Sequence, residues 1–335
     1  MKLAHSLKIE RVIPQGTLAV LVSFRPDAGQ ASDFTFEPGQ YLTLAVGEKG
    51  NEQWRCYSIT SEPAEGGSIS VLVRRVAGGL VSNWICDRAR PGDYMLVRPP
   101  AGRFTLRRAG QSVMLFAGGS GIAPIFALAR QALAKGAPHI SLFYANRDRA
   151  SAMLIAELSS LQEQSHGRFD IRFWYDAEEG LPSQNALQSQ AFNLRGRDVY
   201  LCGPEPFMRA VDASLAEAGF DASSVHREDF GATEEEVEEN NGNLFEALLT
   251  VQIKGAKHTV AVKGRESLLS AMLRAGLTVP HGCKLGECAS CICLLEEGKV
   301  ERLDNAVLDD DDVADGWLVA CRTRALSEEI SIRFR

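Results

Sequence analysis

Hydrophobic and polar positions alternate in short runs along the first hundred residues, and turn-forming segments separate the runs. The runs lie at residues 18–24, 41–46, 68–75 and 94–98. The breaks include Glu37-Pro-Gly, Glu65-Gly-Gly and Arg90-Pro-Gly-Asp. Regularly spaced short strands with such breaks predict an antiparallel β-barrel.

From residue 113 the pattern changes to continuous apolar strands that alternate with helical periodicity. Strand patterns lie at residues 113–117, 140–145, 171–175 and 199–202, and a helical run covers residues 125–133. This alternation predicts a doubly wound α/β domain with a parallel sheet. The glycine-rich loop 118–124 follows the first strand, at the carboxyl edge where such sheets bind nucleotides. A tight turn without a ligand is the alternative, but backbone N–H groups at a helix N-terminus suit a pyrophosphate.

Residues 231–243 break both patterns because they are acidic, polar and free of aromatic side chains. Such a segment cannot bury enough apolar surface to order itself, so we expect a linker rather than the alternative, an exposed helix. Beyond it lie two strand patterns, at residues 247–253 and 258–262. A helix should follow, capped by Ser267 and ending at Arg274.

Four cysteines have the spacing C-x4-C-x2-C…C, which is typical of a plant-type [2Fe–2S] cluster. They are Cys283, Cys288, Cys291 and Cys321, the last in a predicted strand end. With the preceding strands and helix, they predict a small β-grasp ferredoxin domain.

The residues between these cysteines suit a tight metal-binding loop. Gly282 and Gly286 allow sharp turns, and small Ala289 and Ser290 let backbone N–H groups approach the sulfurs. Zinc is an alternative, but structural zinc sites more often show two C-x2-C pairs. Disulfides fit less well, because the chain starts without an apolar signal run and is expected in the cytoplasm. Cys293 lies on a predicted apolar strand and is expected to be a buried small hydrophobe rather than a ligand.

Composition narrows the class of protein. A chain of 335 residues suggests two or three domains, and a net charge of −7 argues against nucleic-acid binding. No apolar stretch approaches the roughly 18 residues that span a bilayer, so we expect a soluble protein. The six histidines form no 2-His-carboxylate grouping, so oxygen chemistry should take place on another protein.

Four further motifs appear in a fixed order ahead of the cysteines. They are Arg55-Cys-Tyr57-Ser58 (R-x-Y-S), Gly79 to Ile85 (G-x2-S-x2-L with Ile in place of Leu), Gly118 to Pro124, and Cys202-Gly-Pro-Glu-Pro-Phe-Met208. Over essentially its whole length the chain resembles the ferredoxin–NADP reductase superfamily, in the variant with a C-terminal plant-type ferredoxin. The runs Asn83-Trp-Ile-Cys-Asp and Tyr144-Ala-Asn-Arg-Asp are similar to reductases of steroid-hydroxylase systems, and phenylacetyl-CoA epoxidase reductases are near relatives.

The resemblance implies a multidomain architecture. Residues 1–108 would form an FAD-binding antiparallel β-barrel, residues 109–230 an NAD(P)-binding α/β domain, residues 231–246 an acidic linker, and residues 247–335 a [2Fe–2S] ferredoxin domain.

The resemblance also implies roles for individual residues. Arg55 would hold the flavin pyrophosphate, Tyr57 would stack on the isoalloxazine, and Ser58 would hydrogen-bond near flavin N5. Further FAD contacts would come from Val73, Arg74, Gly79, Leu80, Val81 and Ser82. The alternatives are a surface salt bridge for Arg55 and barrel packing for Tyr57.

The nicotinamide nucleotide would contact the central domain. Its predicted site is Gly118, Gly119, Ser120, Gly121, Ile122, Asn146, Arg147, Cys202, Gly203, Pro204 and Met208. Phe230 would cover the flavin face that the nicotinamide must reach, although a core-packing role fits it nearly as well. Cys202 would lie near the nicotinamide, and a buried inert thiol is its alternative. Tyr57, Ser58, Cys202 and Phe230 are therefore the predicted catalytic residues.

The implied activity is electron transfer from a reduced nicotinamide through FAD and the cluster to a terminal oxygenase, either Rieske-type or di-iron. A reductase of a small acceptor (quinone, nitro compound or ferric chelate) and a redox sensor are alternatives. NADH is favoured by the resemblance, yet Arg147 and Arg149 could hold the 2′-phosphate of NADPH, whereas Asp148 could contact a ribose hydroxyl. We expect a monomer.

Overall fold

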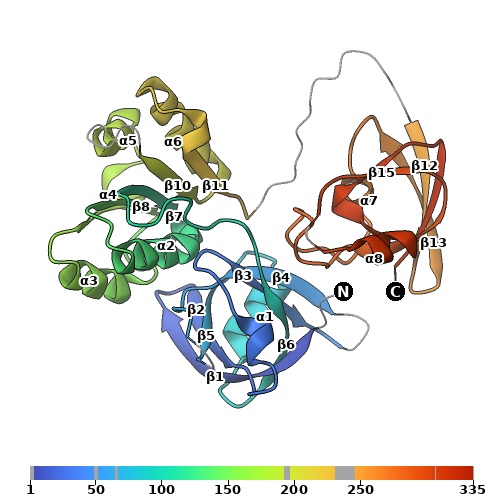
Figure 1. Ribbon diagram of the computed structural model, residues 1–335, viewed down its shortest axis with the longest axis horizontal. Coiled ribbons are helices and arrows are strands. Elements are labelled where there is room, and N and C mark those ends of the chain that lie inside the picture. The colour runs from blue at the N-terminus through green and yellow to red at the C-terminus, as the bar shows by residue number, and fades with distance from the viewer. Residues whose placement is uncertain are drawn as a thin grey trace. The chain divides into compact units, whose positions relative to one another are not determined.

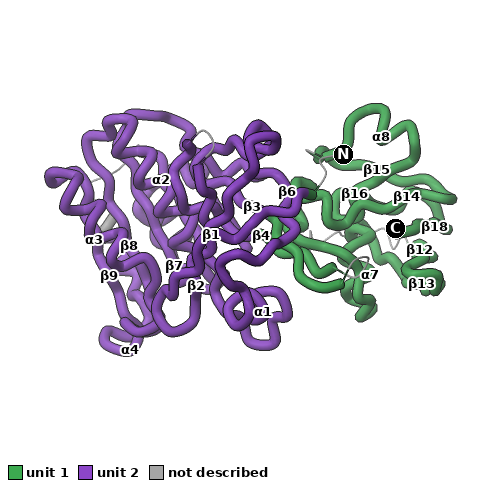
Figure 2. Tube along the Cα trace, turned by 90° about the horizontal axis from the view of Figure 1, so that it is seen from below, with its two compact units in different colours: residues 1–4, 43–56, 232–335 green, residues 5–42, 57–231 purple. Residues whose placement is uncertain are grey.

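The computed structural model describes residues 4–48, 52–64, 67–191, 197–230, 246–305 and 307–334. The chain divides into two compact units, one of residues 1–4, 43–56 and 232–335 and the other of residues 5–42 and 57–231 (Figure 2). The predicted linker at residues 231–246 lies, apart from Glu246, outside the described residues. Among the described residues, none of the helices has the length and apolar character needed to cross a membrane.

Six strands in the first hundred residues form one sheet, in the order β4-β3-β6-β1-β2-β5 (Figure 1). Strand pairs β1–β2, β1–β6 and β2–β5 are antiparallel, as predicted. An antiparallel bridge between Ile59, directly after β4, and Val71 of β5 links the two ends of this order, so the sheet closes into a barrel. The strands are β1 (His5–Gln15), β2 (Ala19–Arg25), β3 (Tyr41–Val46), β4 (Gln53–Ser58), β5 (Ile69–Arg74) and β6 (Tyr94–Ala101).

The central part of the chain forms a five-stranded parallel sheet in the order β11-β10-β7-β8-β9, which confirms the predicted α/β domain. Its strands are β7 (Val113–Gly118), β8 (Ile140–Asn146), β9 (Phe169–Tyr175), β10 (Asp198–Cys202) and β11 (Val225–Glu228). The helices between them are α2 (Ile122–Ala134), α3 (Ile155–Gln164), α4 (Asp176–Glu179), α5 (Gln184–Ala191) and α6 (Glu205–Glu217).

Helices cover both faces of this sheet (Figure 1). Successive side chains of a strand point to opposite faces, and the two cores follow that rule. Leu115 of β7 packs in one core with Leu128 of α2, whereas Phe116 packs in the other with Val211 of α6. Burial on both faces explains why β7 reads as a continuous apolar run rather than an alternating one.

The C-terminal part of the chain forms a second five-stranded sheet, in the order β13-β12-β18-β14-β16. The sequence predicts β12 and β13, an apolar strand that carries Cys293 (β14) and a strand that ends near Cys321 (β16), whereas β18 was not expected. The helix α7 (Leu268–Arg274) begins as predicted, because Ser267 Oγ accepts a hydrogen bond from the backbone N–H of Ser270 at 3.1 Å. The strands are β12 (Glu246–Ile253), β13 (Ala256–Lys263), β14 (Ile292–Glu297), β16 (Trp317–Val319) and β18 (Glu329–Arg333), with β15 (Val300–Arg302) and β17 (Thr323–Ala325) as a separate pair and α8 (Asp310–Ala314) between β15 and β16.

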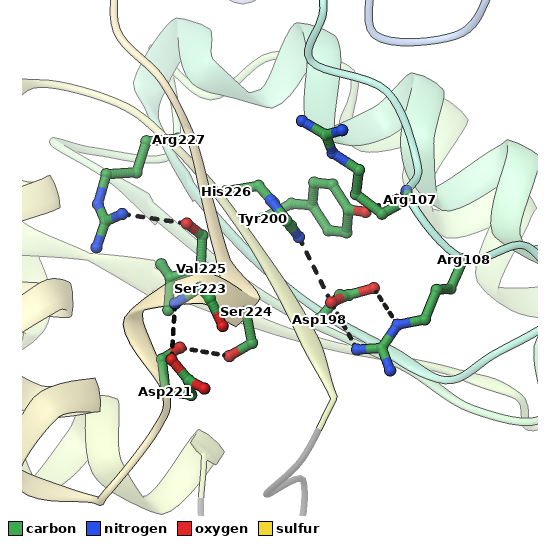
Figure 3. Close-up of polar contacts among 10 residues, drawn as sticks. All are labelled: Arg107, Arg108, Asp198, Tyr200, Asp221, Ser223, Ser224, Val225, His226 and Arg227. Atoms are coloured by element: carbon green, nitrogen blue, oxygen red, sulfur yellow. Dashed lines mark hydrogen bonds and ion pairs between the residues drawn. The ribbon is translucent and has the colours of Figure 1, made fainter.

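The segment between β6 and β7 is held by two side chains of β10 (Figure 3). Arg108 donates two hydrogen bonds to the Asp198 carboxylate, at 2.9 and 2.7 Å, and the backbone N–H of Arg107 donates to the Tyr200 hydroxyl at 2.7 Å. His226 Nε2 lies 3.4 Å from the same carboxylate. Asp198 is almost fully buried, with 7% of its side chain exposed, while Arg108 is half exposed. The connection between the barrel and the parallel sheet is therefore fixed at its carboxyl-terminal half.

Stability should depend on the ionised Asp198. Its hydrogen bond with Arg108 lowers the pKa of this carboxyl below 3.8, so the stabilisation is present above that pH and is lost as the pH falls through the lowered pKa. Asp198→Asn should lower the free energy of unfolding at pH 7 by about 1–2 kcal/mol, less than for a fully buried pair because Arg108 is half exposed. Urea unfolding followed by circular dichroism measures this, and the difference between the two proteins should shrink towards pH 3.

Asp212→Asn is the matched control, because Asp212 pairs with Arg227 on the surface of the same domain. It removes the same charge and should change stability by less than about 0.5 kcal/mol. Equal changes in the free energy of unfolding would show that the buried Asp198 stabilises the domain no more than a surface carboxylate does.

Candidate functional site

Strand β4 carries the R-x-Y-S motif, and its side chains differ sharply in exposure. Arg55 is exposed, Tyr57 is half-buried and Ser58 is buried. Ser58 Oγ is enclosed by the fold yet has no hydrogen-bond partner among the described residues. An unpaired buried hydroxyl costs free energy, so this atom suits a ligand that supplies the missing partner. The finding fits the predicted contact near flavin N5.

The second flavin motif lies at the N-terminus of helix α1 (Leu80–Arg88). Gly79 is the N-cap and has no side chain to cap the helix, so N–H groups of the first turn stay available to an anion. A Cβ on Gly79 would lie 2.6 Å from Ser82 Oγ, which itself accepts a hydrogen bond from the backbone N–H of Val76 at 3.3 Å. The geometry fits a phosphate-binding turn. Of the other predicted contacts, Val73 is fully buried on β5 and Arg74 beside it is half-buried.

The glycine loop packs backbone against backbone on the end of β10. Register pairs Cys202 with Ala117 and Gly118 with Ala145, so the strands end together at one edge of the sheet. A Cβ on Gly121 would lie 2.1 Å from the carbonyl oxygen of Cys202. The glycine loop and the C-G-P segment therefore form one continuous surface. Glycine is required at position 121 because there is no room for a side chain.

Not every predicted nucleotide residue presents its side chain to this edge. The side chains of Cys202 and Met208 are buried in opposite cores of the domain. Burial raises the pKa of Cys202 well above its usual value, so it is a neutral thiol at physiological pH. Asn146 is also buried, at the end of β8. Phe230 is 52% exposed after β11, so core packing, its alternative role, does not describe it.

The cysteine loop adopts backbone conformations that a metal-binding turn requires. Lys284, Gly286 and Ala289 all have positive φ angles, of 60°, 78° and 57°. A Cβ on Gly282 would lie 2.9 Å from Cys288 Sγ, so glycine is needed there for close approach to the sulfur. Cys321 is not at a strand end as predicted; it lies in the 3₁₀ turn Ala320–Arg322 that follows β16. This turn returns the chain to the loop.

The four predicted ligands lie close to one another, and Cys321 interacts with all three of the others. A hydrogen bond with Cys288, together with burial, raises the pKa of Cys283, and a hydrogen bond with Cys291 raises that of Cys321. Backbone N–H groups also donate hydrogen bonds to the sulfurs. The N–H of Cys283 donates to Cys288 Sγ at 3.2 Å, and the N–H of Leu285 donates to Cys283 Sγ at 3.3 Å.

The cysteine site fits the predicted two-iron cluster. Within the ranges that the structure describes, no three His, Cys, Asp or Glu side chains are grouped to hold one metal ion. A [2Fe–2S] cluster takes two ligands on each iron. The donor set, the close N–H groups and the space enforced by Gly282 all fit such a cluster.

Sequence reasoning missed several polar residues around these sites. The Cys288 thiol donates to Ser290 Oγ at 3.3 Å, whereas the sequence pointed only to the small size of Ser290. Glu178 holds Arg149 beyond the end of β8, and Asp198 holds Arg108. No local signal identifies these carboxylates, because each partner lies far away along the chain.

Three family descriptions match successive parts of the chain. They are an oxidoreductase FAD-binding domain at residues 21–106, an oxidoreductase NAD-binding domain at residues 115–213, and a 2Fe-2S iron-sulfur cluster binding domain at residues 251–326. The chain therefore belongs to the ferredoxin–NADP reductase superfamily, in the variant with a C-terminal [2Fe–2S] domain.

Individual relatives narrow the class further. The ferredoxin reductase component of 3-ketosteroid-9-alpha-monooxygenase from Rhodococcus rhodochrous is 34% identical, over 90% of this chain and 88% of its own length. One component of the 1,2-phenylacetyl-CoA epoxidase from Escherichia coli (strain K12) is 30% identical, over 98% and 97%. The structure of phthalate dioxygenase reductase matches with a TM-score of 0.64 and 27% identity, over 99% of this chain and 98% of its own. The chain is an NAD(P)H-dependent flavin and iron–sulfur reductase of the kind that serves oxygenases.

Substitutions in the glycine loop should distinguish two reasons for glycine: the lack of space for a side chain and a positive φ angle. Gly121 has an ordinary helical φ of −60°, so only the contact with Cys202 forbids a side chain there. Gly119 has a φ of +51° but open space around it. Gly121→Ala should destabilise the protein by at least about 3 kcal/mol, because a backbone oxygen cannot move aside easily. Gly119→Ala should cost only about 1–2 kcal/mol.

Urea unfolding at neutral pH followed by circular dichroism measures both variants. The order of the two effects is the critical result. If Gly119→Ala were the more damaging substitution, close packing on Cys202 would not be what the loop requires.

Proposed function

We propose that this chain takes electrons from NADH and delivers them singly to a terminal oxygenase. The single observation that carries the proposal is the proximity of four cysteines from two separate segments, in a chain that also carries two flavin motifs and a nucleotide-binding sheet edge. When bound, FAD would supply hydride acceptance and one-electron release, and the cluster would supply one-electron transfer.

The barrel residues would hold and orient the flavin. Arg55 supplies a fixed cation for the pyrophosphate, and the N-terminus of α1 adds N–H groups through Gly79 and Ser82. Ser58 would donate or accept at N5, which supplies the partner that its buried hydroxyl lacks. Tyr57, half-buried beside it, would stack on the ring system.

The carboxyl edge of the parallel sheet would hold the nicotinamide nucleotide. Residues 118–122 would bring backbone N–H groups to the pyrophosphate, and Gly203 and Pro204 would form the opposite wall. Cys202 would contribute to the form of the nucleotide site rather than act as a nucleophile, because its thiol is buried and neutral. Exposed Phe230, at the end of β11, would shield the flavin face until the nicotinamide displaces it.

Cys283, Cys288, Cys291 and Cys321 would hold the cluster, which would accept and pass on one electron. The N–H groups on the sulfurs would favour the reduced, more negative state.

The relatives indicate the class of the electron acceptor. The relatives' names describe components of a ketosteroid monooxygenase, a phenylacetyl-CoA epoxidase and a glycine betaine monooxygenase. We infer a Rieske-type or di-iron oxygenase as the acceptor. We further propose a monomer in the cytoplasm, where NADH is supplied and free thiols stay reduced, with the domain boundaries 1–108, 109–230 and 247–335.

Cofactor content gives the first test. Protein purified without oxygen should contain one FAD, two irons and two sulfides per chain. Flavin absorbance with iron and sulfide analysis measures this. Stoichiometric zinc with little iron would refute the cluster. With cofactors present, NADH-dependent turnover of a reconstituted oxygenase supports the proposal, and efficient saturable reduction of a quinone or ferric chelate without any oxygenase turnover contradicts it.

Cys288→Ser should divide two activities of the same protein. Ferricyanide can take electrons from the flavin directly, so NADH:ferricyanide activity should stay within about twofold of the wild type, because the flavin motifs lie outside the cluster loop. Cytochrome c reduction should fall at least about tenfold, because it needs the complete ligand set.

Cys293→Ala is the control, since Cys293 is fully buried on β14 outside the ligand set. It should keep both activities and the visible spectrum of the cluster. Parallel loss of both activities in Cys288→Ser would show that the flavin and cluster parts do not function independently.

A further inference from the structure

The ends of β8 and β9 lie side by side at the nucleotide-binding edge. Register pairs Asn146 with Tyr175, the last residues of the two strands. Beyond them the backbone N–H of Ala177 donates to the carbonyl oxygen of Arg147 at 2.9 Å. In a doubly wound sheet, the residues that follow the strand next to the glycine loop meet the ribose of the bound nucleotide. Residues 147–149 and 176–179 therefore surround the expected position of the 2′-substituent.

Both arginines of this region are already held by carboxylates. Arg149 donates to Glu178 through two hydrogen bonds, Nε to Oε1 at 2.7 Å and Nη2 to Oε2 at 2.8 Å. Its guanidinium also lies over the Tyr175 ring, with Cζ 4.3 Å from the centroid. Arg147 Nε lies 2.9 Å from a carboxylate oxygen of Asp148, whose other oxygen accepts the N–H of Ser151 at 2.8 Å.

These carboxylates are ionised at neutral pH. The hydrogen bond from Arg147 lowers the pKa of Asp148 to about 2, and the hydrogen bond from Arg149 lowers the pKa of Glu178. Asp176 and Glu179 add two more acidic groups in the same short helix, α4. Two arginines thus face four carboxyl groups, so the region offers a phosphate little uncompensated positive charge.

We propose that Glu178 determines nucleotide specificity by acting through Arg149: it occupies the two donors that a 2′-phosphate would need and holds the guanidinium against Tyr175. The inference rests on the proposed function, because it assumes that a nicotinamide nucleotide docks at the glycine loop. A 2′-phosphate brings almost two negative charges and needs a free bidentate arginine. A 2′-hydroxyl is neutral and can donate to Asp148. The arrangement therefore selects NADH over NADPH.

The test compares the two nucleotides in the full-length protein loaded with FAD and cluster. Glu178→Gln removes the charge and keeps the shape. The NADPH/NADH ratio of kcat/KM should rise about tenfold, which is the effect of removing one unit charge several ångströms from a doubly charged group in water. The gain should lie in the KM for NADPH rather than in kcat, because Glu178 is expected far from the hydride. It should shrink at high ionic strength.

Binding without turnover provides a second readout. By calorimetry, Glu178→Gln should bind 2′,5′-ADP about tenfold more tightly relative to 5′-AMP. Adding Arg149→Ala to this variant should remove the gain, since Arg149 is the group that Glu178 releases. Glu163→Gln, on the exposed surface of α3, removes the same charge elsewhere in the domain and should leave the ratio unchanged.

An unchanged ratio in Glu178→Gln, in both kinetics and binding, would overturn the inference, as would a wild-type protein that uses NADPH as well as NADH. Both outcomes leave the proposed function intact. Failure of both nucleotides to reduce the flavin in the wild type would instead refute the proposed function itself.

Discussion

Close packing of backbone on backbone at the carboxyl edge of the parallel sheet is the constraint on which the nucleotide domain depends. A Cβ on Gly121 would lie 2.1 Å from the Cys202 carbonyl oxygen, so even a methyl group there would overlap the backbone of β10. That contact aligns the start of α2 with the end of β10, and both then face one edge. The glycine loop, the backbone of the C-G-P segment and the end of β8 lie at this edge because parallel strands end together. The cysteine loop has the same requirement, since a side chain on Gly282 would lie too close to the sulfur of Cys288.

Local motifs were predicted well because their meaning depends on neighbours in the sequence. The helix cap at Ser267, the glycine loop and the cysteine spacing each require only a few consecutive residues to have a physical effect. The pattern of apolar and polar positions predicted the antiparallel barrel and the parallel sheet. One strand of the C-terminal sheet, β18, was not predicted, because its five residues alternate over too short a run to be distinguished from a loop.

Long-range polar pairs could not be predicted in the same way. Asp198 and Arg108 are 90 positions apart, and Arg149 and Glu178 are 29 apart. Nothing in the immediate sequence of either carboxylate identifies its partner, since exposed acidic residues are common. The sequence also treated the C-G-P segment as one unit, whereas the fold directs the side chains of Cys202 and Met208 into two different cores and leaves the backbone between them at the edge. A motif residue can therefore be required for its main chain alone.

Two ion pairs of the central domain have different roles because they differ in burial: one contributes to stability and the other affects ligand binding. Asp198 is almost completely removed from water, so an ion pair there anchors the chain between barrel and sheet, and losing the arginine's partner leaves an energetic deficit. Arg149 and Glu178 are both largely exposed, and such a pair contributes little to stability. An exposed pair that is weak for folding can still be decisive for binding, because an anionic ligand must displace one partner before it can use the other. The net charge of the whole chain therefore does not predict the preference between NADH and NADPH. The local arrangement of two arginines and four carboxyl groups is what we expect to determine it.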